Sequence, residues 1–112
     1  MSFLSAIFGD KSIQNECITV LSPIEFKSQV DGKNVQLIDV RTSNEFNSNH
    51  IKGAKNIDFF SGSFNLELNK LNKDKPVYVY CRSGSRSRQT ANKLANMEFK
   101  KIYDLRGGIL NY

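Results

Sequence analysis

One run of consecutive apolar residues constrains the fold more than any other feature of this sequence. The run Val77–Tyr80 follows Lys75-Pro76 and carries no charge, a pattern typical of a strand that is buried on both faces of its sheet. Such a sheet needs helices packed on both sides, and its strands are usually parallel. The run therefore favours an α/β fold and predicts that residues 77–80 form a central strand.

The rest of the chain alternates between strand-like and helix-like segments. Ser22, Pro23 and Glu25 match a helix N-cap, a first-turn proline and a capping-box glutamate, and Gly32 would end that helix. Further helices are expected over residues 43–47, 61–71 and 87–98, and strands over residues 17–21, 35–40, 77–80 and 101–105 and in a short piece ending near residue 57. The order βαβαβαβαβ predicts an open, mainly parallel five-stranded sheet with helices on both faces.

Length and composition allow one compact domain. A chain of 112 residues has the size of a single domain, and 39% hydrophobic residues against 24% charged residues can supply its core. We expect an N-terminal extension at residues 1–15 and the domain at residues 16–112. Apolar stretches are too short to span a membrane, and the first residues lack the features of a secretory signal. A cytoplasmic protein without membrane contact is therefore expected.

The two cysteines, Cys17 and Cys81, are too few and too far apart for a disulfide framework or a zinc site. Thiols in a reducing compartment fit this usage better. Cys17 begins the first expected strand, and we interpret it as an inert core thiol. No metal or cofactor is implied.

The loop after the buried strand has the composition of an anion-binding site. Its sequence is Cys81-Arg82-Ser83-Gly84-Ser85-Arg86, and it lies between the expected central strand and the next helix. It therefore occupies the carboxyl end of a parallel strand, where open α/β sheets bind ligands. A short loop that winds into a helix turns several backbone N–H groups inward, and these N–H groups can bind an anion. Such surroundings favour a cysteine thiolate, which is the nucleophilic form.

Several segments together are similar to the single-domain rhodanese sulfurtransferases, from about residue 17 to the C-terminus. The matching segments are Asp39-Val40-Arg41, Glu45-Phe46, His50-Ile51-Lys52-Gly53-Ala54-Lys55-Asn56-Ile57, Val79-Tyr80-Cys81-Arg82-Ser83-Gly84-Ser85-Arg86-Ser87 and Gly107-Gly108. The resemblance implies that Cys81 attacks the sulfane sulfur of a small anionic donor such as thiosulfate and carries it as a persulfide. A thiophilic acceptor then removes the sulfur: cyanide in an assay, or a thiol or protein in the cell. Covalent catalysis in two half-reactions predicts ping-pong kinetics.

The remaining site residues are assigned around this cysteine. We expect Cys81 to be the catalytic nucleophile and Arg82, Ser83, Gly84, Ser85 and Arg86 to bind the substrate, with the two arginines as the side chains that bind the anionic donor. Asp39 and Arg41 are expected to tie neighbouring loops together, and His50 is expected to be a hydrogen-bonded loop residue rather than a general base. Glu45 is interpreted in the same way as His50, and Arg88 as a surface residue.

Two other kinds of function remain open. Phosphatases and arsenate reductases of the same fold have a loop one residue longer, with an arginine six positions after the cysteine, where this chain has Ser87. A sulfur-carrier or docking module without activity of its own is the other alternative. The net charge of +5 favours anionic partners. The lysines of the chain are scattered along the sequence, however, and do not form the basic stripe with interleaved aromatic residues that is typical of nucleic-acid binding.

Overall fold

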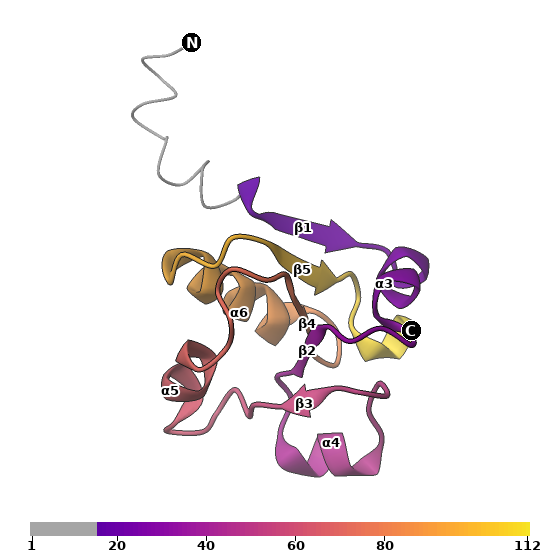
Figure 1. Ribbon diagram of the computed structural model, residues 1–112. Helices are drawn as coiled ribbons and strands as arrows, with labels where there is room; N and C mark the ends of the chain where they lie inside the picture. Colours follow the sequence, from indigo (N-terminus) through magenta and orange to yellow (C-terminus); the bar gives the residue numbers. More distant parts are fainter. Residues whose placement is uncertain (1–15) are drawn as a thin grey trace.

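The computed structural model describes residues 16–112, and within them the chain forms one sheet with helices on both sides (Figure 1). The expected N-terminal extension at residues 1–15 lies outside the described residues. The elements are β1 (Ile18–Leu21), α3 (Pro23–Val30), β2 (Gln36–Asp39), α4 (Ser43–Ser48), β3 (Lys55–Asn56), α5 (Phe64–Asn69), β4 (Val77–Tyr80), α6 (Ser85–Asn96), β5 (Ile102–Leu105) and the 3-10 turn η1 (Ile109–Asn111). The five strands have the order β1-β5-β4-β2-β3, and all neighbours are parallel. The predicted α/β class, strand number and alternation are confirmed.

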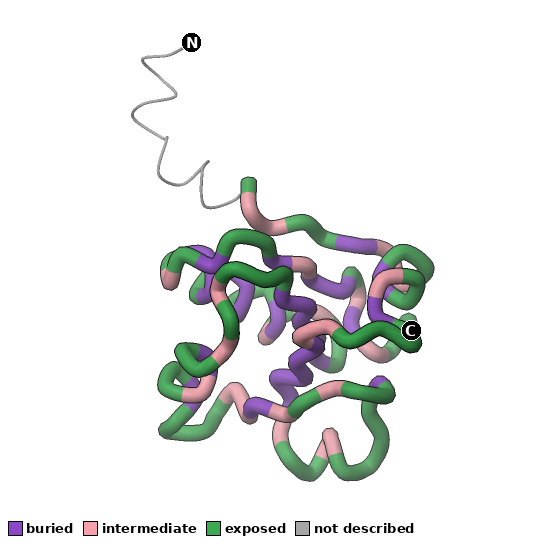
Figure 2. The backbone as a smooth tube through the Cα atoms, viewed as in Figure 1, coloured by how far each residue is buried: buried purple, intermediate pink, exposed green. Residues whose placement is uncertain are grey.

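Strand β4 is the middle strand and the most deeply buried part of the sheet. All four of its residues are buried, and it pairs with β2 on one side and β5 on the other. Figure 2 shows the buried backbone concentrated in the central strands, with exposed segments around them. The prediction of a central strand over residues 77–80 is therefore confirmed.

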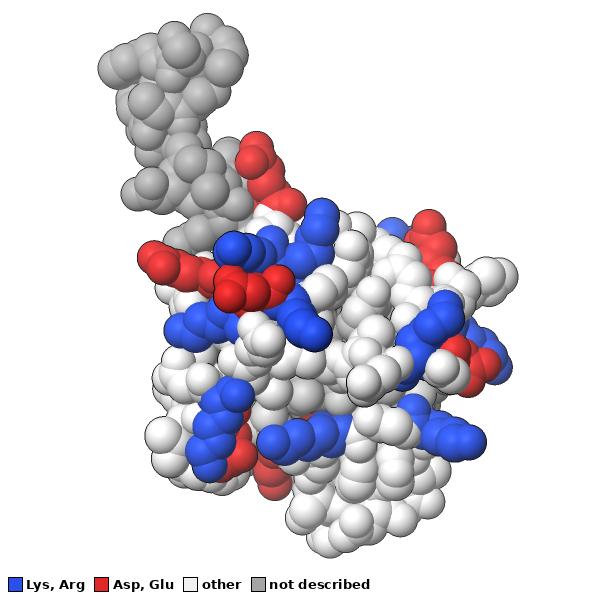
Figure 3. All heavy atoms as spheres, viewed as in Figure 1, with Lys and Arg blue, Asp and Glu red and all other residues white. Residues whose placement is uncertain are grey.

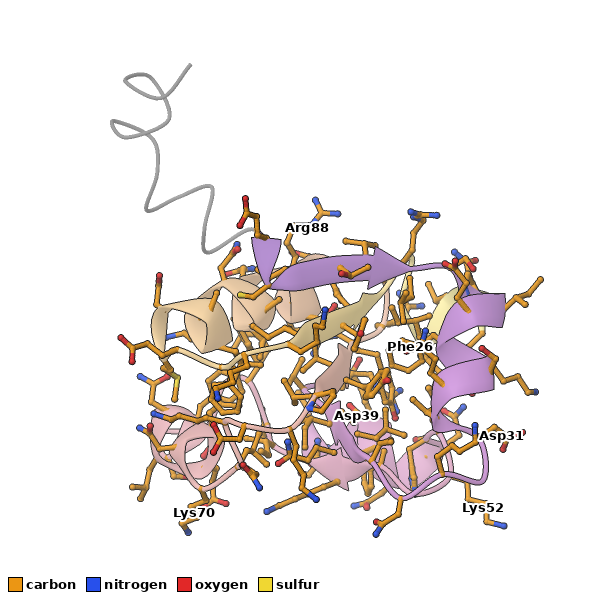
Figure 4. The ribbon with its side chains drawn as sticks, turned by 45° about the horizontal axis from the view of Figure 1, so that its top comes forward. Phe26, Asp31, Asp39, Lys52, Lys70 and Arg88 are labelled. Carbon is orange, nitrogen blue, oxygen red and sulfur yellow. The ribbon has the colours of Figure 1, made fainter. Side chains whose placement is uncertain are left out.

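The two faces of the sheet carry separate apolar clusters. Helices α5 and α6 cover one face, where Phe64 and Leu68 of α5 and Leu94 of α6 pack on the strands. Helix α3 covers the other face through Phe26 and Val30. Phe26 lies on the side of α3 that faces the sheet (Figure 4). The helices on both faces supply the burial that an uncharged central strand requires.

Local hydrogen bonds explain where the helices begin. In α3 the Glu25 N–H donates to Ser22 Oγ (3.2 Å) and the Ser22 N–H donates to Glu25 Oε1 (2.9 Å), so the predicted capping box is present. Helix α6 begins at Ser85, two residues earlier than predicted. The reason is that Gly84, with φ of 118°, turns the chain and serves as the N-cap residue. Helix α5 is shorter than predicted, since residues 61–63 form a turn in which the Ser63 N–H donates to Ser61 Oγ (3.1 Å).

The C-terminal segment supports the loop that follows β4. The Ile109 N–H donates to the Cys81 carbonyl oxygen (2.9 Å), and the Leu110 N–H donates to the Arg82 carbonyl oxygen (3.2 Å). Gly108 makes this approach possible, with φ of 68° and a backbone so close that an added Cβ would lie 2.3 Å from the Arg82 carbonyl oxygen. A glycine is required at this position both by conformation and by space.

Among residues 16–112, no helix is long and apolar enough to cross a membrane.

We expect Gly108→Ala to lower the free energy of unfolding by about 3 kcal/mol or more, because the new methyl group meets backbone atoms at a φ that side chains disfavour. Chemical denaturation measures this change. Gly62→Ala is the matched control, since Gly62 has no positive φ and open space around it, and its effect should stay within about 0.5 kcal/mol. Equal stability of the two variants would contradict the close packing of Gly108.

Candidate active site

The cysteine that follows β4 is buried, and its sulfur is contacted by two backbone N–H donors. Cys81 is 1% exposed, and its sulfur accepts hydrogen bonds from the Gly84 N–H (3.1 Å) and the Ser87 N–H (3.3 Å). The Ser87 N–H belongs to the first turn of α6, where N–H groups have no partner within the helix. The positive end of the helix therefore points at the sulfur, and this arrangement stabilises negative charge on it.

Gly84 gives the loop its shape. Its φ of 118° is in the range that side chains rarely adopt, and this turn directs the Gly84 N–H toward the sulfur while α6 starts at the next residue. Arg82, Ser83 and Ser85 are exposed on the outside of the same loop. Arg82 forms no ion pair with any residue in the range 16–112.

Arg86 is held beside the loop by an acidic partner on another helix. Its guanidinium donates through Nη1 to Glu45 Oε1 (2.8 Å) and through Nη2 to Glu45 Oε2 (3.1 Å). The same guanidinium lies 5.9 Å from the ring centre of Phe60, which is largely exposed. The hydrogen bonds from Arg86, together with those from Thr42, lower the pKa of Glu45 to about 2. Arg86 is thus a fixed cation at the edge of the site, with its fork already occupied.

Asp39 and Arg41 form a buried ion pair behind the site. Arg41 Nη2 lies 2.7 Å from Asp39 Oδ2 and also donates to the Asn49 carbonyl oxygen (2.6 Å). Asp39 lies near the centre of the molecule (Figure 4). Next to this pair the Ile51 N–H donates to Tyr80 Oη (3.0 Å). These contacts join the end of β2 to residues 49–51 and β4, so the pair ties together the segments around the site.

His50 lies on the surface and does not contact the loop that surrounds the Cys81 sulfur. Its Nδ1 is 2.8 Å from the Phe46 carbonyl oxygen, and its ring stacks on the Phe46 ring with centroids 3.8 Å apart. None of its hydrogen bonds or ring contacts reaches Cys81 or the loop over residues 82–86.

A cavity of about 350 Å³ adjoins the outer side of the loop. It is lined by Ser83, Gly84 and Ser85 from the loop and by residues of α6, β1 and β5, among them Arg88, Asp104 and Arg106. Arg88 projects at the surface beside β1 (Figure 4). Elsewhere on the face seen in Figure 3, Lys and Arg side chains lie in separate places with Asp and Glu among them, rather than in one basic stripe.

Cys17 lies at the amino end of β1 and Cys81 at the carboxyl end of β4, so they are at opposite ends of the parallel strands. Ile18, the residue after Cys17, is level with Ile102 and through it with Val77, whereas Cys81 comes after the last residue of β4. At 3.3 Å per residue their backbones are roughly 17 Å apart along the strands, so the two cysteines cannot form a disulfide in this fold. Cys17 packs against the core cluster on the face covered by α5 and α6, and burial raises the pKa of its thiol.

Three residues near the sulfur were not assigned a role there from the sequence. Glu45 could be placed as the capping-box residue of α4, but its pairing with Arg86 joins positions 41 residues apart. Ser87 and Asp104 are both buried and hydrogen-bonded to each other (2.6 Å). The signal that could have found Asp104 is an acid inside an otherwise apolar strand, since an unpaired charge is rarely buried. Among residues 16–112, no group of three or more His, Cys, Asp and Glu side chains could hold a metal ion.

The Glu45–Arg86 pair predicts a pH-dependent contribution to stability. Because the pKa of Glu45 in the folded chain is about 2, below its usual value of 4.5, the pair stabilises the fold fully above about pH 5 and is lost as the pH falls toward 2. Glu45→Gln should lower the free energy of unfolding by about 1–2 kcal/mol at pH 7, allowing for solvent screening, and by progressively less below pH 4.5. Denaturation of both chains between pH 2 and 7 checks this, and a difference that does not change with pH would contradict it.

Comparison with known proteins agrees with this geometry. A family model described as the rhodanese-like domain matches residues 22–112. YqhL of Bacillus subtilis, a protein without an assigned function, is 35% identical over 107 residues, which cover 96% of this chain and 82% of that protein. Thiosulfate sulfurtransferase GlpE of Shewanella oneidensis is 33% identical over 90 residues, covering 79% of this chain and 85% of GlpE.

A longer relative and a solved structure complete the comparison. The tRNA uridine(34) hydroxylase of Pelagibacter ubique is 32% identical over 102 residues, but the match spans only 34% of that protein. The crystal structure of a rhodanese-like domain protein from Staphylococcus aureus superimposes with a TM-score of 0.72 at 28% identity and covers 83% of this chain and 89% of that one. The solved structure agrees with the fold described here, and since the family model matches residues 22–112, the chain belongs to the rhodanese-like domain family.

Proposed function

We propose that this chain is a sulfurtransferase that moves a sulfane sulfur from a small anionic donor such as thiosulfate to a thiophilic acceptor through a persulfide on Cys81. The observation that carries the proposal is the position of the Cys81 sulfur, which accepts two backbone N–H groups at the start of α6. The relative GlpE of Shewanella oneidensis is a thiosulfate sulfurtransferase, which supports the same reaction for this chain. The activity of the longer tRNA hydroxylase relatives is not carried over, because this chain matches only about a third of their length.

In the first half-reaction the Cys81 thiolate attacks the outer sulfur of thiosulfate. A new sulfur–sulfur bond forms at Cys81, the bond between the two sulfur atoms of thiosulfate breaks, and sulfite leaves with the electron pair. The product is a persulfide anion on Cys81. The N–H groups of Gly84 and Ser87 stabilise negative charge in this pocket, because they are fixed in direction before the reaction begins.

In the second half-reaction a nucleophilic acceptor attacks the outer sulfur of the persulfide. Cyanide leaves as thiocyanate, and a thiolate leaves as a persulfide of the acceptor, while Cys81 returns to the thiolate. The donor product departs before the acceptor reacts, so ping-pong kinetics are expected. A reducing cytoplasm would suit this cycle, since Cys81 must stay reduced between turnovers.

The arginines of the loop have different roles in this proposal. Arg82 is exposed and has no acidic partner within residues 16–112, so it is available to bind the sulfonate end of the donor. Arg86 is already paired with Glu45 and contributes a fixed positive charge at the edge of the site. Ser83, Gly84 and Ser85 present the outer surface of the loop to the donor or acceptor.

The position six residues after the cysteine argues against the phosphatase or arsenate reductase alternative. It holds Ser87, which is fully buried, and its Oγ lies 3.5 Å from Cys81 Sγ. An arginine fork that would bind two oxygens of a phosphate is therefore missing from this place. A sulfur carrier would form the same persulfide, and it differs from a sulfurtransferase only in needing a partner for one of the half-reactions.

The persulfide is the first prediction to test. Incubation with thiosulfate should add about 32 Da to the intact chain, the mass of one sulfur atom, and cyanide should remove it. Peptide mapping should place the added mass at Cys81. Cys81→Ser should abolish both the mass gain and the turnover, whereas Cys17→Ser should leave both unchanged. Turnover retained by Cys81→Ser would contradict the mechanism.

A second prediction concerns donor binding. Arg82→Ala should raise the KM for thiosulfate about five- to tenfold with a smaller change in kcat, because a side chain that binds donor and transition state alike acts on KM. Lys101→Ala removes the same charge just before β5, at the end of the strands opposite the loop, and should leave KM unchanged. Equal effects of the two substitutions would show that only the overall charge of the chain matters.

A further inference from the structure

Two buried side chains lead away from the Cys81 sulfur, Ser87 and then Asp104. Cys81 Sγ lies 3.5 Å from Ser87 Oγ, and Ser87 Oγ lies 2.6 Å from Asp104 Oδ1. Cys81 is 1% exposed, Ser87 0% and Asp104 3%. The three groups come from three different segments, the end of β4, the first turn of α6 and β5. Nothing in the sulfur-transfer steps described above uses Asp104.

The Ser87 hydroxyl has a single proton and several neighbours that could accept it. The possible acceptors are Asp104 Oδ1 at 2.6 Å, the Gly84 carbonyl oxygen at 3.2 Å and Cys81 Sγ at 3.5 Å. When Asp104 is a carboxylate, the short contact identifies it as the acceptor, since charge-assisted hydrogen bonds are the shorter and stronger ones. Ser87 then offers Cys81 only a lone pair, which can accept a thiol S–H but cannot donate to a thiolate.

Asp104 is placed so that it can hold a proton near neutral pH. Burial raises its pKa to about 6, although the Ser87 hydrogen bond and the charge of Arg88 lower it in part. Arg88 of α6 and Arg106, just after β5, are the charged groups that line the adjoining cavity with Asp104. Within the sheet, β5 lies between β1 and β4. Val20 of β1 and Val79 of β4 are level with Asp104. The neighbours on both strands are thus uncharged.

We propose that Asp104, Ser87 and Cys81 form a hydrogen-bond relay in which the neutral form of Asp104 favours the thiolate of Cys81 and its carboxylate form favours the thiol. The thiol proton moves from Cys81 Sγ to Ser87 Oγ while the Ser87 proton moves to Asp104 Oδ1. One proton passes along the chain, no bond to carbon changes and no oxidant or reductant takes part. After the transfer, neutral Asp104 donates to Ser87 Oγ, and the Ser87 O–H donates to the Cys81 thiolate.

The relay gives the sulfur anion a third hydrogen bond in addition to the two from the backbone. It also removes the negative charge of Asp104 at the moment when negative charge develops on the sulfur, so that two anions do not face each other in a buried site. Asp104 acts through Ser87 and is therefore a positioning residue. The inference rests on the proposed function only for its relevance to turnover, since thiol ionisation can be measured without any sulfur donor.

The test is the rate of Cys81 alkylation by iodoacetamide between pH 5 and 9, in a Cys17→Ser background so that one thiol reacts. In Asp104→Asn the side-chain amide donates to Ser87 Oγ at every pH, and the Ser87 O–H is released toward the sulfur. Alkylation at pH 6 should therefore be about tenfold faster than in the parent chain, since one additional hydrogen bond from a neutral donor to an ion shifts an ionisation equilibrium by about a power of ten.

Ser87→Ala separates the relay from simple charge repulsion. If Ser87 carries the coupling, Asp104→Asn should accelerate alkylation much less in a Ser87→Ala chain than in the parent chain. An equal acceleration in both backgrounds would show that Asp104 acts through space, and this would overturn the relay. No acceleration by Asp104→Asn in the parent chain would overturn it as well, since the hydroxyl would then have turned to the Gly84 carbonyl oxygen.

An NMR titration keeps Asp104 and Ser87 unchanged, so it tests the coupling even where substitutions at these buried residues prevent folding. The carboxyl carbon of Asp104, followed by NMR across the same pH range, should titrate in two steps when Cys81 is present, because coupled groups share their titration. In Cys81→Ala it should titrate in one step. A single identical step in both chains would overturn the relay, whereas persulfide formation from thiosulfate would still test the proposed function independently.

Discussion

The structure depends on how the chain passes from a fully buried strand into a helix within a few residues. Strand β4 ends at Tyr80 and α6 begins at Ser85, so the intervening backbone must turn sharply, and Gly84 makes this turn in a conformation that a side chain would resist. The unpaired N–H groups of the helix start then converge on the residue at the strand end. A cysteine at this place receives two hydrogen bonds on its sulfur as a consequence of backbone geometry.

Other parts of the molecule hold this turn in place from three sides. The C-terminal turn binds the carbonyl oxygens of Cys81 and Arg82, and Gly108 allows it to approach closely enough. Glu45 holds Arg86 from the side of α4. The buried pair of Asp39 and Arg41 fixes the segments next to β4, and removing one member of such a pair would leave an unpaired buried charge.

Local patterns of the sequence were sufficient to predict the elements and their order. The uncharged run at residues 77–80 and the capping box at Ser22 both depend on neighbouring residues alone, and both are present. The start of α6 was predicted two residues late because the backbone of Gly84, rather than a side-chain cap, begins that helix. The pairing of Glu45 with Arg86 and of Ser87 with Asp104 could not be predicted. Both depend on the strand order β1-β5-β4-β2-β3, which no local pattern specifies.

The groups around Cys81 support the proposed transfer of a single sulfur atom better than the binding of a phosphate. Arg86 is a cation paired with Glu45, and Asp104 is an acid whose pKa lies near 6. The two backbone N–H groups on the sulfur are fixed dipoles, which neither move nor titrate. A phosphate would need side-chain cations directed into the loop, whereas here the position six residues after Cys81 holds a buried hydroxyl. The buried hydroxyl and the two backbone donors at this cysteine therefore support the proposed transfer of a single sulfur atom, and in that proposal the exposed Arg82 recognises the donor anion.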